Sequence, residues 1–149
     1  MNSIWSQIKQ ALFVVHFTNV EDVKSFRDAI KEAGLNINDC EIIAVVATKK
    51  EKDLLPVISS VTFVNTKEFG LLGKIKNENF KKVIPRAFDA LFYVGDFSKS
   101  LSKHISRINK KIAIGINSQM NDCSVYINTN SGGNTHLVNF AKQTLEKTI

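Results

Sequence analysis

Basic side chains recur at every fourth position in one segment and continue just beyond it. They are Lys99, Lys103 and Arg107, followed by Lys110 and Lys111. A four-residue spacing places side chains on one face of a helix, where cations can contact successive phosphates of a nucleic acid. The same pattern is typical of the solvent-exposed face of an amphipathic helix, so both interpretations stay open. The chain carries a net charge of +6, which allows an acidic partner such as RNA.

Hydrogen-bonding side chains follow three of the apolar segments that we expect to form strands. They are Thr18, Asn19, Asp96, Ser98 and Ser118. In an open parallel sheet, ligands bind at the carboxyl ends of the strands, where the strand order reverses. These residues therefore predict a crevice for a small polar ligand. The alternative is that Thr18 and Ser98 only cap helices.

A third candidate is the turn before the last expected helix, formed by Gly132, Gly133 and Asn134. Glycines ahead of a helix can leave backbone N–H groups free to bind an anion. The same residues also make an ordinary tight turn.

The sequence contains no recognisable catalytic pattern, and the catalytic residues are unknown. The three histidines, His16, His104 and His136, have no Ser, Cys or carboxylate at a spacing typical of a catalytic triad. The turn over residues 17–21 contains no glycine, which argues against a dinucleotide bound in the usual way. The segment 70–75 has two residues between its glycines where a phosphate-binding loop has four. We therefore expect no cofactor.

The two cysteines, Cys40 and Cys123, have no neighbouring His or Cys at zinc-ligand spacing. No metal site is expected. We place the cysteines at the starts of two strands far apart in one sheet, and therefore predict that both thiols are reduced.

The elements that must position these residues alternate along the chain. Apolar runs predict strands over 11–17, 41–48, 61–66, 90–94, 112–116 and 123–128. Periodic apolar faces predict helices from about Thr18 to Ala33, over 77–84, from Phe97 to Ile108 and over 135–147. We expect Thr18 and Glu21 to form a capping box, Gly34 to stop the first long helix, and one helical turn to lie within 53–59.

This alternation is typical of the α/β class, with helices on both faces of a parallel sheet. It predicts a single three-layer Rossmann-like domain over residues 1–149, with a six-stranded, mostly parallel sheet of order 3-2-1-4-5-6. The sixth strand follows a short turn and is the one strand whose direction stays open. The segment 87–117 forms the central strand–helix–strand unit.

The segments FGLLGKIKNENFKKVI and FDALFYVGDFSKSLSKHISRINKKIAIGI resemble a family of small, uncharacterised α/β proteins of Bacteroidetes-type bacteria. The residues that carry the resemblance are Phe69, Gly73, Lys74, Ile75, Phe88, Asp89, Lys111 and Gly115. The resemblance implies a fold and a lineage. It assigns no catalytic residue.

The second of these segments is also similar to the N-terminal half of GT-B glycosyltransferases of the heptosyltransferase type. In that family a second Rossmann domain supplies most of the sugar-nucleotide site, and we expect this chain to lack it. The resemblance therefore implies the fold of this chain and not a transferase activity.

Taken together, the sequence predicts a non-enzymatic binding or scaffold domain, with RNA or a ribonucleoprotein as candidate partner and self-association as another. The alternative is a small nucleotide or nucleotide-sugar binder, or enzyme, that uses Asp96 as its acid or base. The N-terminal segment lacks the pattern of a signal peptide, and no apolar run approaches the ~20 residues of a membrane span. We expect a cytoplasmic protein with no membrane partner.

Overall fold

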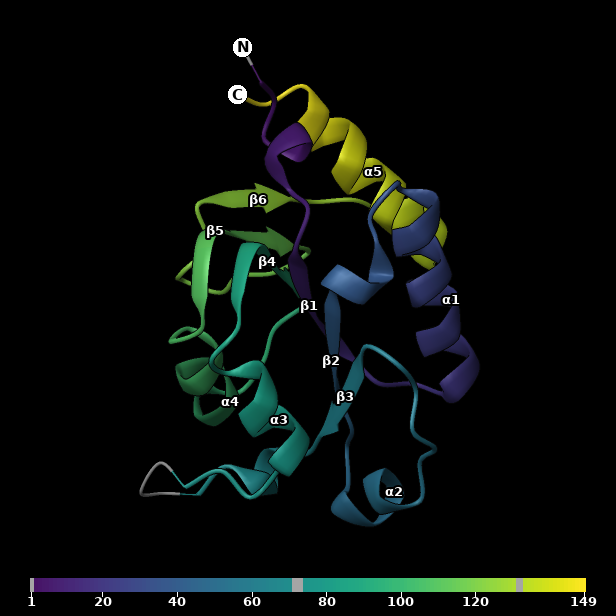
Figure 1. Cartoon of the computed structure of the whole chain (residues 1–149), viewed down its shortest axis with the longest axis vertical. Helices are drawn as coiled ribbons and strands as arrows, with labels where there is room; N and C mark the ends of the chain where they lie inside the picture. Colours follow the sequence, from purple (N-terminus) through teal and green to yellow (C-terminus); the bar gives the residue numbers. More distant parts are fainter. Residues whose placement is uncertain (1, 71–73, 131–132) are drawn as a thin grey trace.

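The computed structural model describes residues 2–70, 74–130 and 133–149. Its centre is a six-stranded sheet of order β3-β2-β1-β4-β5-β6, in which every neighbouring pair is parallel (Figure 1). The strands are β1 (Ala11–His16), β2 (Glu41–Val45), β3 (Val61–Val64), β4 (Ala87–Val94), β5 (Asn109–Ile116) and β6 (Val125–Ile127). The predicted α/β class and strand order are confirmed, and the sixth strand is parallel to the fifth.

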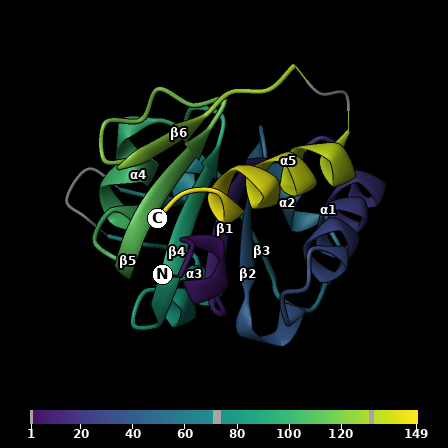
Figure 2. The same ribbon diagram turned by 90° about the horizontal axis from the view of Figure 1, so that it is seen from above.

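Helices cover both faces of this sheet (Figures 1 and 2). They are α1 (Val20–Glu32), α2 (Lys49–Asp53), α3 (Glu78–Val83), α4 (Lys99–Ile105) and α5 (Asn134–Glu146), with short 3-10 helices η1 (Trp5–Gln7), η2 (Ile37–Asp39) and η3 (Thr66–Glu68). Residues of α1 and α5 join one apolar cluster, and residues of α3 and α4 join the other. Within the described residues, no helix is long and apolar enough to cross a membrane.

The central strands are apolar at nearly every position because both of their faces are buried. In β1, Phe13 enters the cluster shared with α1 and α5, while Leu12 and Val14 enter the cluster shared with α3 and α4. The ring of Phe13 stacks on that of Phe92 in β4, with centroids 4.7 Å apart. This packing fixes the register of β1 against β4, the strands between which the order reverses.

Several local predictions were wrong. The helix predicted to reach Ile108 ends at Ile105, and β5 begins at Asn109, ahead of the predicted residue 112. The capping residue of α1 is Asn19, whose side chain accepts a hydrogen bond from the Asp22 N–H at 2.7 Å, and the predicted box with Thr18 does not form. The short helix α2 begins before the predicted segment 53–59 because Thr48 caps it, accepting from the Glu51 N–H at 3.1 Å. Gly34 does follow the end of α1 with a φ of +95°, as its predicted role as a helix stop requires.

Candidate functional site

At the ends of β1 and β4, where the crevice is predicted, the ring of His16 contacts the loop that follows β4. His16, the last residue of β1, stacks on Phe97 with ring centroids 4.3 Å apart. Its Nε2 lies 2.7 Å from the backbone oxygen of Asp96. The two loops that leave the strands are therefore joined directly to each other.

The polar residues predicted for this crevice mostly serve the fold around it. Asn19 caps α1, and Ser98 caps α4 by accepting from the Leu101 N–H at 3.4 Å, whereas Thr18 is exposed. The structure brings Asp96 and Ser118 together: Asp96 Oδ1 accepts from the Ser118 hydroxyl at 3.4 Å and from the Gln119 N–H at 2.6 Å. Asp96 thus anchors the loop that follows β5.

A cavity of about 140 Å³ opens beside His16 on the side of α1 and α5. Asn134 closes it, because its side-chain amide donates to the Asp22 carboxylate at 2.8 Å and to the Asp22 backbone oxygen at 3.1 Å. Ligand sites for small molecules measure about 300–1,000 Å³. The predicted anion-binding turn lies at this point: Gly133 is the N-terminal flanking residue of α5, and Gly132 falls outside the described residues.

A larger groove of about 480 Å³ runs between α4 and the loop over residues 117–124. We call it the α4 groove. Its lining residues are Phe97, Lys99, Ser102, Lys103, Ser106, Gln119, Met120, Asn121 and Asp122. The groove therefore combines Lys99 and Lys103, two cations of the predicted basic patch, with the Asp122 carboxylate, side-chain amides, hydroxyls and two apolar side chains.

The loop wall of the α4 groove is held by hydrogen bonds from the strands behind it. The buried Tyr93 hydroxyl donates to Asp122 Oδ2 at 3.0 Å, and the Tyr126 hydroxyl donates to the backbone oxygen of Met120. Burial, followed by the Asp122 charge, raises the pKa of Tyr93, so this hydroxyl remains a proton donor. The loop is thereby fixed to the strands behind it.

A close approach between β5 and β6 also shapes this wall. A Cβ added at Gly115 would lie 3.1 Å from Tyr126 Cδ1 and 3.2 Å from Ser118 Cβ. A larger residue here would therefore push against the Tyr126 ring and Ser118, so the glycine favours the close approach by which Tyr126 reaches Met120. Gly115 is one of the residues that carried the family resemblance, and this contact gives it a physical role.

The structure separates the five residues of the predicted basic patch. Lys99 and Lys103 line the α4 groove, and Arg107 is exposed just past the end of α4. Lys110 donates to the Ser106 and Ile108 backbone oxygens at 2.8 and 3.3 Å. Lys111 forms an ion pair of 3.3 Å with Asp89, near the amino end of β4. Only part of the patch can therefore face one ligand.

Sequence reasoning missed the other wall of this groove. The sequence predicts no more than a polar turn at Gln119, Met120 and Asn121. It places Phe97 on the apolar face of a helix, whereas all four residues line the groove. No sequence signal could have found them, because this wall depends on β6 running parallel to β5, a direction that the sequence leaves open. In the structure, the segment that joins these two parallel strands lies opposite α4 and lines the groove.

Both thiols are free in the structure. Burial raises the pKa of the Cys40 thiol, and burial together with Asp122 raises the pKa of Cys123 to about 11. Because the thiolate is the reactive form, we expect Ellman's reagent to modify both cysteines slowly in the native protein. After denaturation without reductant, it should titrate both at once. Fewer than two free thiols in the denatured chain would contradict the prediction that both are reduced.

The imidazole of His104 is buried on the inner side of α4, with its ring centroid 5.3 Å from that of Phe69. Burial, then the positive charges of Arg107 and Lys103, lower its pKa below the ordinary value of 6.5. As the pH falls, the imidazole is therefore protonated in the unfolded chain before it is protonated in the folded protein. The free energy of unfolding should fall as the pH drops through about 6.5. Urea unfolding between about pH 8 and about pH 5.5 measures this slope. His104→Gln should reduce it and His136→Gln should not; equal slopes in all three proteins would refute the assignment.

Within the described residues, no group of three or more His, Cys, Asp or Glu side chains could hold a metal ion. Residues 1–145 match the model of a protein family described as a family of unknown function (DUF6913). The chain belongs to this family. No curated protein matches the chain. Membership in DUF6913 carries no assigned activity or site residue, so the function must be inferred from the groove itself.

Proposed function

We propose that this DUF6913 protein is a non-enzymatic, single-domain binding module that holds single-stranded RNA in the α4 groove. The observation that carries the proposal is the position of Lys99 and Lys103 on one wall of a groove of about 480 Å³. Lysines along a groove bind the phosphates of a nucleic-acid backbone, and the net charge of +6 favours the encounter with a polyanion.

The opposite wall carries the groups that bases require. The side-chain amides of Gln119 and Asn121 offer donors and acceptors to base edges, and they lie on the loop held by Tyr93 and Asp96. Phe97 and Met120 add apolar surface, on which unstacked bases can pack. Single strands expose their bases in this way, whereas duplexes do not.

A second candidate is a nucleotide or nucleotide-sugar binder at the carboxyl ends of β1 and β4. The exposed carboxylate of Asp96, close to Ser118, favours it. Three predictions from the sequence also remain proposals. They are the similarity to heptosyltransferase-type GT-B enzymes, the Bacteroidetes-type origin and the cytoplasmic location.

Salt dependence distinguishes the two candidates. Fluorescence anisotropy of a labelled single-stranded oligoribonucleotide should report binding that weakens steeply between about 50 and about 200 mM salt. Duplex RNA of the same length and a uridine-diphosphate sugar serve as comparison ligands. Absence of RNA binding at the lowest salt would refute the RNA proposal, and binding of the sugar nucleotide with a salt slope much shallower than that of the oligonucleotide would support the second candidate.

A further inference from the structure

The loop between α2 and β3 exposes large apolar side chains to solvent. Leu54 is 80% exposed and Val57 is 101% exposed, within the sequence Leu-Leu-Pro-Val-Ile over residues 54–58. Single exposed apolar residues are ordinary on protein surfaces, but a cluster on one loop marks an interaction site. We call this segment the apolar loop.

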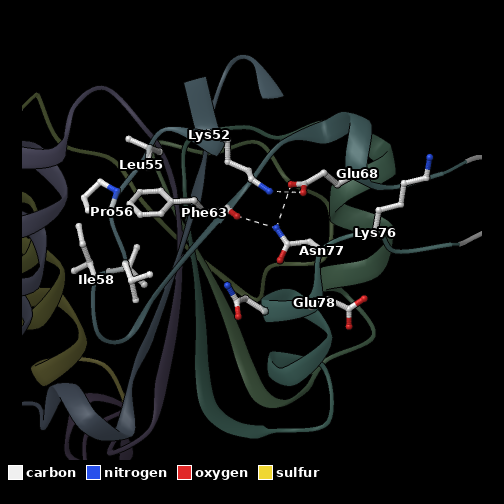
Figure 3. A pocket seen from close by; sticks show the side chains of 12 residues that line it. Lys52, Leu55, Pro56, Ile58, Phe63, Glu68, Lys76, Asn77 and Glu78 are labelled. Carbon is white, nitrogen blue, oxygen red and sulfur yellow. Dashed lines mark hydrogen bonds and ion pairs between the residues drawn. The ribbon is translucent and has the colours of Figure 1, made fainter. Parts of the chain in front are cut away.

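A cavity of about 230 Å³ lies directly beside the apolar loop, between β3 and the start of α3. Figure 3 shows Leu55, Pro56, Ile58 and Phe63 gathered on one side of it, with Lys52, Glu68 and Asn77 on the other. Projecting apolar side chains and a recess with an apolar wall therefore occur next to each other on the same surface.

The polar wall of this cavity is a closed network that keeps the recess in shape. Lys52 Nζ pairs with Glu68 Oε2 at 2.5 Å, and Glu68 Oε1 accepts from the Asn77 amide at 3.1 Å (Figure 3). The Asn77 amide also donates to the backbone oxygen of Phe63 at 2.8 Å. This bond occupies an acceptor on the outer edge of β3, so a partner that simply extends the sheet is disfavoured there.

The arrangement of apolar and charged groups indicates the occupant. A two-fold interface presents the same patch on both subunits, so the patch must complement itself. A projecting apolar group beside an apolar recess meets that requirement. Exposed charges of both signs border the cavity and the adjoining helix, namely Lys50, Glu51, Lys76 and Glu78. Such a mixed rim can pair with its own copy, whereas an anionic lipid surface or an RNA backbone favours a rim of positive charges alone.

We propose that this face is the interface of a homodimer, in which Leu54 and Val57 of one protomer pack into the cavity of its partner. The face lies at the β3 edge of the sheet, and the α4 groove lies beside the loop that joins β5 to β6. Dimerisation would leave the α4 groove of each protomer open. The proposal is therefore independent of RNA binding.

Sedimentation velocity over a micromolar concentration series tests this interface without RNA. We expect the parent protein to approach twice its 16.7 kDa mass as concentration rises. The double variant Leu54→Ser, Val57→Ser should stay monomeric at the same concentrations. Because both side chains are exposed, its far-ultraviolet circular dichroism should match the parent. The matched control is Ile149→Ser, which removes an apolar side chain that is 74% exposed at the C-terminus and should still dimerise.

Three results would overturn the proposal. The first is a parent protein that remains monomeric throughout the series, and the second is a dimer that persists in the double serine variant. The third is a monomeric parent that binds vesicles containing anionic lipid through Leu54 and Val57, which would assign the apolar loop to a membrane surface.

Discussion

Replacing Lys99 and Lys103 by glutamine is expected to flatten the salt dependence of RNA binding as well as weaken it. Each phosphate contact on a single strand contributes about 0.7 to the slope of log K against log salt, so losing two contacts should reduce the slope by about 1.4. Both side chains are exposed along the α4 groove, and their removal should leave the fold intact. Anisotropy titrations at several salt concentrations measure the slope directly.

The matched control for this double variant is Lys111→Gln. Lys111 belongs to the same basic stretch of sequence but pairs with Asp89 and does not line the groove. Its replacement should leave the salt slope unchanged. If Lys111→Gln reduced the slope as much as the double variant does, binding would be due to general positive charge and not to the groove.

Removing the carboxylate of Glu68 is expected to destabilise the fold by about 3 kcal/mol, because taking one partner from a buried ion pair leaves the other partly desolvated. Glu68 is 3% exposed and accepts hydrogen bonds from the Asn65 N–H and the Asn77 amide as well as from Lys52. In Glu68→Ala the buried Asn65 N–H and Asn77 amide lose this acceptor, and the half-buried Lys52 loses its close ion-pair partner. Urea unfolding of both proteins at one protein concentration measures the difference in the free energy of unfolding.

An exposed ion pair on the next helix supplies the control. Glu78 pairs with Lys81 at 3.1 Å with its side chain 80% exposed. Surface pairs of this kind contribute about 0–1 kcal/mol, so Glu78→Ala should cost less than about 1 kcal/mol. Equal losses in the two variants would contradict the structural role of the Glu68 network.

The fold could be predicted because its signals are local and repeated. Strands such as β1 and β2 are apolar at nearly every position, which is typical of strands buried on both faces, and the connection rules then restrict their order. Errors arose where two neighbouring residues compete for one role. Thr18 and Asn19 can both cap a helix, and the choice depends on where the chain leaves the sheet.

The candidate site was less predictable because its walls come from segments distant in sequence. Lys103 and Asn121 face the same groove, yet no spacing rule connects them. The predicted basic patch illustrates the same limit. Four-residue spacing holds only while the chain is helical, and α4 ends at Ile105, so Lys110 and Lys111 follow other geometry.

The most direct test of RNA binding in the α4 groove is an amide chemical-shift titration of the isotope-labelled protein with a short single-stranded oligoribonucleotide. We predict that the largest shifts occur at Lys99, Lys103, Gln119 and Asn121, on both walls of the groove. The amide resonance of Lys111 should not shift. Shifts confined to Thr18, Asn19 and Asp96, or no shifts at any of these residues, would contradict the proposal.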